Sequence, residues 1–164
     1  MWWSSHLRFA AFIAIAVMLS ACGFALRGSY TMPYASVYLN AANNTPLVAE
    51  LKHQLSASTQ LAPNATGAAA KLNIIADRRD KQILSLSGAG RVREYELKLL
   101  VSYQVVDAAG TVVIPTTEIL LSRIMSFDDS LIIAKQQEEA QLYKDMETDV
   151  VSQILRRMVA IKAK

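Results

Sequence analysis

The strongest constraint on the fold is a strict alternation of side chains over residues 92–106. Every second residue from Tyr95 to Val105 is apolar or aromatic, and polar residues stand between them, apart from Leu100. Successive side chains of a strand point to opposite faces of a sheet. The segment therefore predicts a long strand with one buried and one solvated face, which is typical of an antiparallel sheet.

Two turn signals connect this strand to its neighbours. Residues 107–110 (DAAG) predict a tight turn into an apolar strand over 111–125, in which Pro115 indicates an edge position or a bulge. Residues 87–90 (SGAG) join the strand to an arm over 71–86. The three strands are expected to form an antiparallel meander.

The N-terminal part of the body predicts a short strand at 35–40 and a helix at 46–60. Thr45 is a plausible N-cap, and Pro46 in the first turn has no amide hydrogen to lose. The apolar positions of the helix recur every four residues, at Leu47, Leu51 and Leu55. Because the helix separates the first strand from the one beginning near Lys71, we expect these two strands to be parallel.

The C-terminal part predicts one long helix from a cap at Asp128 or Asp129. Its apolar stripe, expected to pack on the sheet, starts with Leu131 and Ile132 and, after a polar stretch, continues through Leu142, Met146, Val150, Val151, Ile154, Leu155 and Met158. About 30 residues would span ~45 Å, more than a domain of this size covers, so the helix either kinks or projects at one end. We therefore predict an α+β fold, a two-layer sandwich of two helices on a four-stranded mixed sheet in the order β-α-β-β-β-α, as one domain over residues 35–164.

The first 34 residues predict export and lipidation. Residues 1–21 have the features of a signal peptide, with a basic start and an 11-residue apolar run that is short for a membrane span. Leu19-Ser20-Ala21-Cys22 resembles the bacterial lipobox, in which the cysteine is acylated; the alternative is that Cys22 is a small buried apolar residue. Residue 23 is Gly rather than Asp, which in such lipoproteins favours the outer membrane. Residues 22–34 would then be a lipidated tether.

Composition excludes most kinds of chemistry. The chain has 164 residues, 52% hydrophobic and 19% charged, which suits one folded domain. A single Cys rules out a disulfide framework and a Cys-based zinc site. After removal of residues 1–21, His53 is the one histidine left, so no nucleophile–base pair and no multi-His metal site can be identified. We predict that the protein is not an enzyme and carries no metal or cofactor.

One basic cluster is the most informative polar feature. Five basic residues and one acid fall within residues 78–93, for a local charge of +4. The basic residues are Arg78, Arg79, Lys81, Arg91 and Arg93. Arginine binds phosphate through paired hydrogen bonds, so the cluster could bind a multiply phosphorylated ligand; alternatively, the charges solvate an exposed edge. Nucleic acid is not an expected partner, because an exported lipoprotein does not meet it.

Several short motifs, in order and spacing, resemble the LptE family of lipopolysaccharide-assembly lipoproteins of Gram-negative outer membranes. They are CGxxLR at 22–27, Glu94-Tyr95, RIMSFD at 123–128 and the helix entry at 133–138. The resemblance implies a sandwich of two helices on a four-stranded sheet. Family members plug the lumen of the LptD β-barrel from the periplasmic side, assist its assembly and bind lipopolysaccharide on its way to the outer leaflet.

The resemblance also implies lipopolysaccharide contacts at the hairpin tip and at the start of the last helix. Lys135 matches the second position; the alternative, which is slightly less favoured, is an ordinary solvated helix residue. At the tip, Gly88 stands where a basic residue is expected, and Arg91 and Arg93 are the nearest substitutes. The full candidate set is Arg91, Arg93, Lys135, Arg78, Arg79 and Lys81, with Cys22 as the lipidation site.

Two rival functions follow from the same residues. The first is a periplasm-facing lipoprotein that binds cell-wall glycan or inhibits a periplasmic enzyme. The second is a hydrolase, which would need a nucleophile and a base; His53 would have to supply the base.

Overall fold

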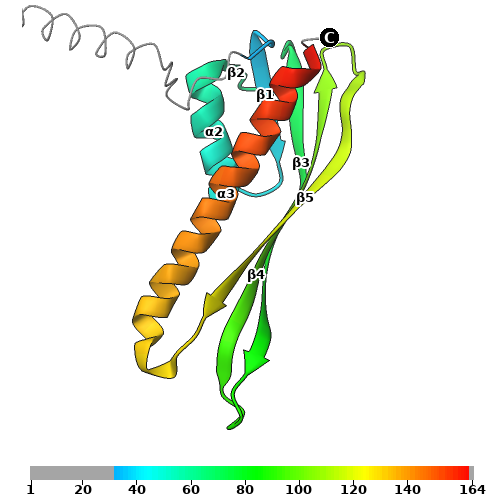
Figure 1. Ribbon diagram of the computed structural model, residues 1–164. Helices are drawn as coiled ribbons and strands as arrows, with labels where there is room; N and C mark the ends of the chain where they lie inside the picture. Colours follow the sequence, from blue (N-terminus) through cyan, green and yellow to red (C-terminus); the bar gives the residue numbers. More distant parts are fainter. Residues whose placement is uncertain (1–31, 163–164) are drawn as a thin grey trace, which may run out of the picture.

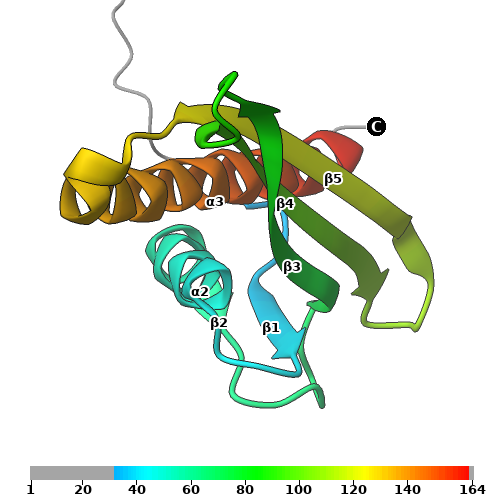
Figure 2. The ribbon, with the colours of Figure 1, turned by 90° about the horizontal axis from the view of Figure 1, so that it is seen from below.

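The computed structural model describes residues 32–162 and shows two helices packed on one face of a mixed sheet (Figures 1 and 2). The elements are β1 (Ser36–Ala41), α2 (Pro46–Ser58), β2 (Gln60–Leu61), β3 (Ala70–Leu86), β4 (Val92–Asp107), β5 (Val112–Ser126), the 3₁₀ turn η1 (Asp129–Leu131) and α3 (Ile132–Lys162). The predicted α+β fold class is confirmed. The predicted signal peptide, Cys22 and the tether up to residue 31 lie outside the described residues.

The sheet has the order β2-β1-β3-β4-β5, so it has five strands where the sequence predicts four. The additional strand, β2, is two residues long and pairs in parallel with β1. Such a short segment cannot show an alternating pattern, which is why the sequence does not indicate it. The predicted parallel pairing of β1 with β3 and the antiparallel β3–β4–β5 meander are both confirmed.

The alternation in β4 places its apolar residues in the core between sheet and helices. Leu97, Leu99, Val101, Tyr103 and Val105 are all completely buried. Pro115 lies in β5, which is an edge strand, and it falls where the β4–β5 register shifts between Tyr103 and Val105. Both expectations for this proline are therefore confirmed, because an edge or a bulge tolerates the missing amide hydrogen.

Helix α2 begins and ends for local reasons. The Thr45 side chain accepts a hydrogen bond from the Val48 amide (3.3 Å), and Pro46 occupies the first turn. The Leu47–Leu51–Leu55 stripe is buried. The helix ends at Ser58, two residues earlier than predicted, because residues 60 and 61 pair with β1 instead.

Helix α3 is one continuous helix of 31 residues, about 46 Å long. Of the two expected alternatives, a kink or a projecting end, the structure has the projecting end. Asp128 caps η1 by accepting a hydrogen bond from the Ser130 amide (2.9 Å). The C-terminal half buries the predicted stripe from Met146 to Met158. The N-terminal half extends past α2 (Figure 1), and Leu131 and Ile132 are exposed rather than packed, which corrects the expected stripe.

The two ends of the molecule differ in what they carry. The proximal end holds the starts of β1 and β3, the β4–β5 turn and the C-terminal end of α3. The distal end holds the β3–β4 hairpin tip and the connection from β5 to α3 (Figure 1). The 17 residues of β3 place the two ends about 50 Å apart. Within residues 32–162, no helix combines the length and the apolar character needed to cross a bilayer.

Candidate functional site

The hairpin tip at the distal end is a well-defined turn. The Ser87 amide donates to the Arg91 carbonyl (2.7 Å), and the Gly90 amide donates to the Ser87 carbonyl (2.9 Å). Gly90 has φ +76°, in the left-handed region that favours glycine. The turn thus fixes the point from which Arg91 enters β4.

The strand register divides the basic cluster of the sequence into two groups. Arg78 and Arg79 lie opposite Leu100 and Leu99, whereas Leu86 lies opposite Val92 near the tip. Leu99 is six residues from Arg93 along β4, a separation of about 20 Å. Arg78 and Arg79 therefore do not join Arg91 and Arg93 at the tip, although all are close in sequence.

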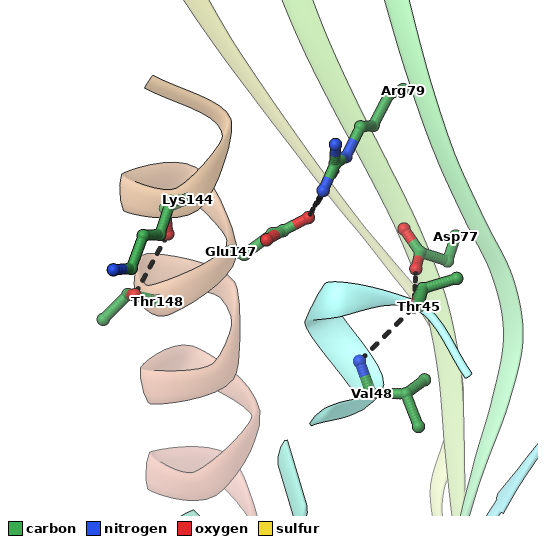
Figure 3. Close-up of polar contacts among 7 residues, drawn as sticks. All are labelled: Thr45, Val48, Asp77, Arg79, Lys144, Glu147 and Thr148. Carbon is green, nitrogen blue, oxygen red and sulfur yellow. Dashed lines mark hydrogen bonds and ion pairs between the residues drawn. The ribbon is translucent and has the colours of Figure 1, made fainter. Parts of the chain in front are cut away.

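Arg79 and Lys81 face the helix layer and are already paired with carboxylates of α3. The Arg79 guanidinium donates to Glu147 through Nε (3.1 Å) and Nη2 (Figure 3). It also lies 5.0 Å from the Tyr143 ring centroid. Lys81 Nζ contacts Glu139 (2.6 Å) and lies 4.2 Å from the Tyr95 ring centroid. These two cations hold α3 against the sheet and would have to lose a partner to bind an anion. Arg78 is exposed on the open face of the sheet.

The second group consists of Arg91, Arg93 and Lys135, which gather at the β5–α3 connection. The Phe127 amide donates to the Arg93 carbonyl (2.7 Å), which ties the connection to the hairpin. Lys135 Nζ donates to the Ser126 hydroxyl (3.0 Å) and pairs with Glu138 (2.7 Å). Like Arg79 and Lys81, it would have to exchange a carboxylate for an anionic ligand. Among residues 32–162, neither Arg91 nor Arg93 forms an ion pair, and both are exposed.

The electrostatics of Asp128 relate Lys135 to Arg91. Hydrogen bonds from the Ser130 hydroxyl and amide hold the pKa of Asp128 below its usual value. The positive charges of Lys135 and Arg91 lower this pKa further, so both cations lie close to the same carboxylate. The hairpin tip and the start of α3 are thus neighbours at the distal end, where Asp128 lies near both cations.

Sequence reasoning missed a set of exposed apolar side chains at the same end. Their positions are Ile83, Leu84 and Leu86 at the end of β3 and Leu131, Ile132 and Ile133 at the start of α3. We call these six residues the apolar patch. Tyr95, which lies opposite Ile83 in the strand register, and Phe127, four residues before Leu131, form an edge-to-face pair with ring centroids 5.1 Å apart. The run of three apolar residues at 131–133 is visible in the sequence, but its exposure depends on where the sheet ends.

The remaining candidates for chemistry are isolated. His53 is exposed on α2, beside a groove between α2 and α3 that Lys144 and Glu147 also line. In the part of the chain that the structure describes, no group of three or more His, Cys, Asp or Glu residues could hold a metal ion. Thr148 lines the same groove, and its hydroxyl donates to the Lys144 carbonyl (3.0 Å) rather than to His53.

Comparisons with known proteins identify a matching family and solved structures with the same fold. The family model of LptE, lipopolysaccharide-assembly, matches residues 34–158. No curated protein sequence matches the chain. The solution structure of lipoprotein B from Nitrosomonas europaea is 38% identical and superimposes with a TM-score of 0.74, over 86% of this chain and 93% of that one.

Two further solved structures share the fold. Rare lipoprotein B from Shewanella oneidensis is 23% identical with a TM-score of 0.68, over 78% of this chain and 96% of that one. A minor lipoprotein from Acinetobacter baumannii is 24% identical with a TM-score of 0.63, over 80% and 95% of the two chains. The architecture described above is thus also found in lipoproteins of other bacteria.

Proposed function

Because the chain belongs to the LptE lipopolysaccharide-assembly family, we propose that it is a lipid-anchored outer-membrane subunit that occupies the lumen of the LptD β-barrel. In this role it assists assembly of the barrel and binds lipopolysaccharide during delivery to the outer leaflet. The role is one of binding and support, without a catalytic step. The observation that carries the proposal is the gathering of Arg91, Arg93 and Lys135 at the end opposite to the start of β1.

The position of the anchor supports this orientation. Cys22 precedes β1, which starts at the proximal end. The tether from residue 22 to residue 34 can extend at most about 40 Å. Acyl chains on Cys22 would hold the proximal end near the periplasmic leaflet, and two or more chains give stable anchoring.

The length of the sandwich fits passage through a bilayer. The two ends lie about 50 Å apart along β3, whereas a hydrocarbon core is about 30 Å thick and a whole bilayer about 40–45 Å. A domain held at the periplasmic leaflet could therefore present its distal end at the depth of the outer leaflet, where lipopolysaccharide is delivered.

The open face of the sheet supports a place inside a polar lumen. Lys98 pairs with Glu96 (3.0 Å), and Ser122 donates to the same glutamate (2.7 Å). Lys98 also donates to Gln82 on β3 (3.4 Å). The interior of an outer-membrane barrel is polar, so the polar part of this face, which also carries exposed Leu120 and Ile124, can lie against it.

Charge reversal tests the ligand part of the proposal. The triple variant Arg91→Glu, Arg93→Glu, Lys135→Glu should weaken lipopolysaccharide binding at least tenfold at low salt, because ion pairing with phosphate becomes repulsion. The matched control is Lys52→Glu, Lys144→Glu, Arg156→Glu, which changes the charge equally at exposed sites away from the distal end. Equal affinities of the two variants at low salt would remove the electrostatic mechanism.

Co-purification tests the partner part. Affinity-tagged protein from detergent-solubilised outer membrane should bring down a large barrel protein, and mass spectrometry should find acyl groups on Cys22. If acylated protein never brings down a barrel, the plug role is wrong, and a free-standing lipoprotein that binds glycan or inhibits an enzyme becomes the better explanation.

A further inference from the structure

Building on the proposed function, we propose that the distal end has a second subsite, the apolar patch, which binds the acyl chains of the same phosphorylated glycolipid. Arg91, Arg93 and Lys135 bind its phosphates, and the patch contacts its fatty part. The distal end thus recognises both the charged part and the apolar part of the ligand.

The first argument is the concentration of exposed apolar side chains. Residues 32–162 contain eleven large hydrophobic residues that are exposed, and six of them form the patch. The most exposed is Ile133, at 69%, and the least is Leu84, at 46%. Scattered apolar residues on a surface need no explanation, but a concentration at one end marks an interaction site.

The second argument is that packing within the chain does not use these side chains. Two shifts in the β3–β4 register fall between Ile83 and Leu86, and such bulges re-aim side chains. On α3, the buried stripe begins only at Tyr143, ten residues after Ile133. Much of the surface of these six side chains is therefore left for contacts outside the chain.

The third argument identifies the occupant. A polar barrel lumen does not favour contact with an apolar surface. A place inside the barrel therefore does not by itself explain the patch. Tyr95 lies opposite Ile83 and pairs with Phe127, four residues before Leu131, and Lys135 follows Ile132 by three residues. Cations beside aliphatic and aromatic side chains complement a ligand that joins phosphates to fatty chains. When the proximal end is held at the leaflet of the Cys22 anchor, the patch lies about 50 Å from that leaflet.

The test compares two probes that share their phosphates. One is rough lipopolysaccharide with its acyl chains; the other is the same molecule chemically deacylated to its phosphorylated oligosaccharide. The patch variant is Ile83→Thr, Ile132→Gln, Ile133→Gln in the full chain. Its matched control is Ile75→Thr, Val112→Thr, Leu120→Thr, which removes equally exposed apolar residues elsewhere (56%, 49% and 60%).

The patch variant should lose at least tenfold in affinity for the acylated probe and less than twofold for the deacylated one. The control variant should match wild type with both probes, and circular dichroism should show that all variants are folded. Wild-type affinity of the folded patch variant for the acylated probe would overturn the inference, as would an equal loss for both probes.

Two other results separate this inference from the proposed function. If the patch variant keeps its affinity for acylated lipopolysaccharide but recovers less of the barrel, the patch contacts the partner protein, and the acyl subsite is refuted while the proposed function stands. If wild-type protein binds neither probe, the lipopolysaccharide part of the proposed function fails, and this inference fails with it.

Discussion

Replacing Arg79 with methionine tests how α3 is held against β3. Glu147 is 4% exposed and accepts hydrogen bonds from two nitrogens of Arg79. Methionine keeps much of the aliphatic length of arginine but removes the guanidinium group. A nearly buried carboxylate then loses its partner, which is costlier than the loss of a surface ion pair.

The magnitude follows from the exposure of the two partners. Removing one member of a fully buried pair costs about 3–5 kcal/mol. The Arg79 side chain is 41% exposed, so water can partly replace it, and we reduce the cost to about 2 kcal/mol. Loss of the cation–π contact with Tyr143 adds about 0.5 kcal/mol. The free energy of unfolding should fall by about 2–3 kcal/mol and the Tm by about 8–12 °C.

Urea titration and thermal melting followed by circular dichroism measure this loss. The matched control is Arg123→Met, because Arg123 and Asp149 form an ion pair at 3.3 Å with side chains 48% and 47% exposed. The control should cost less than about 1 kcal/mol. Adding Glu147→Leu to Arg79→Met should recover part of the loss, since the unpaired buried carboxylate is then gone. If Arg79→Met costs no more than Arg123→Met, water solvates Glu147 and the reasoning is wrong.

Three further changes test local features of the fold. Thr45→Ala should lower the free energy of unfolding by about 1–2 kcal/mol, because Thr45 caps α2 and donates a hydrogen bond to Asp77; Thr45→Ser should retain most of the stability in the same urea titration. Gly90→Ala should cost about 1 kcal/mol because φ is +76°, whereas Gly88→Ala, with no positive φ and open space around it, should cost less; comparable losses would contradict the assigned turn. The pKa of Asp128 is lowered in the folded protein, so its contribution to stability is present above the unfolded value of about 3.8 and is lost as the pH falls through the folded value. The stability difference between wild type and Asp128→Ala should accordingly be largest near neutral pH and shrink below pH ~4; a difference that is constant with pH would show that the carboxylate charge has no role.

Much of the fold could be predicted because its signals are local. The alternation in β4 depends on the geometry of a single strand, and the cap at Thr45 depends on an amide three residues away. Strand β2 was not predicted, because two residues are too few to show a periodic pattern. The exposure of Leu131 and Ile132 was not predicted either, because an apolar residue at helical spacing is buried only where another layer faces it.

The candidate site divides in the same way. Short motifs were enough to propose lipidation at Cys22 and ligand binding by the basic hairpin and Lys135. Lipidation and ligand binding both remain predictions. The sequence could not predict which basic residues form ion pairs with α3 and which do not. Arg79 contacts a carboxylate 68 residues away, and Lys81 contacts one 58 residues away. Composition shows that these acids exist but not which cation each one neutralises.

By itself, the amino-acid sequence determined the order of the main strands and helices, because periodicity, caps and turn residues act within a few positions of the chain. Only the tertiary structure decided which cations form ion pairs, where α3 extends past α2, and that six exposed apolar residues lie at the distal end. These properties depend on strand register and on contacts between distant elements, and they exist only once the layers have packed.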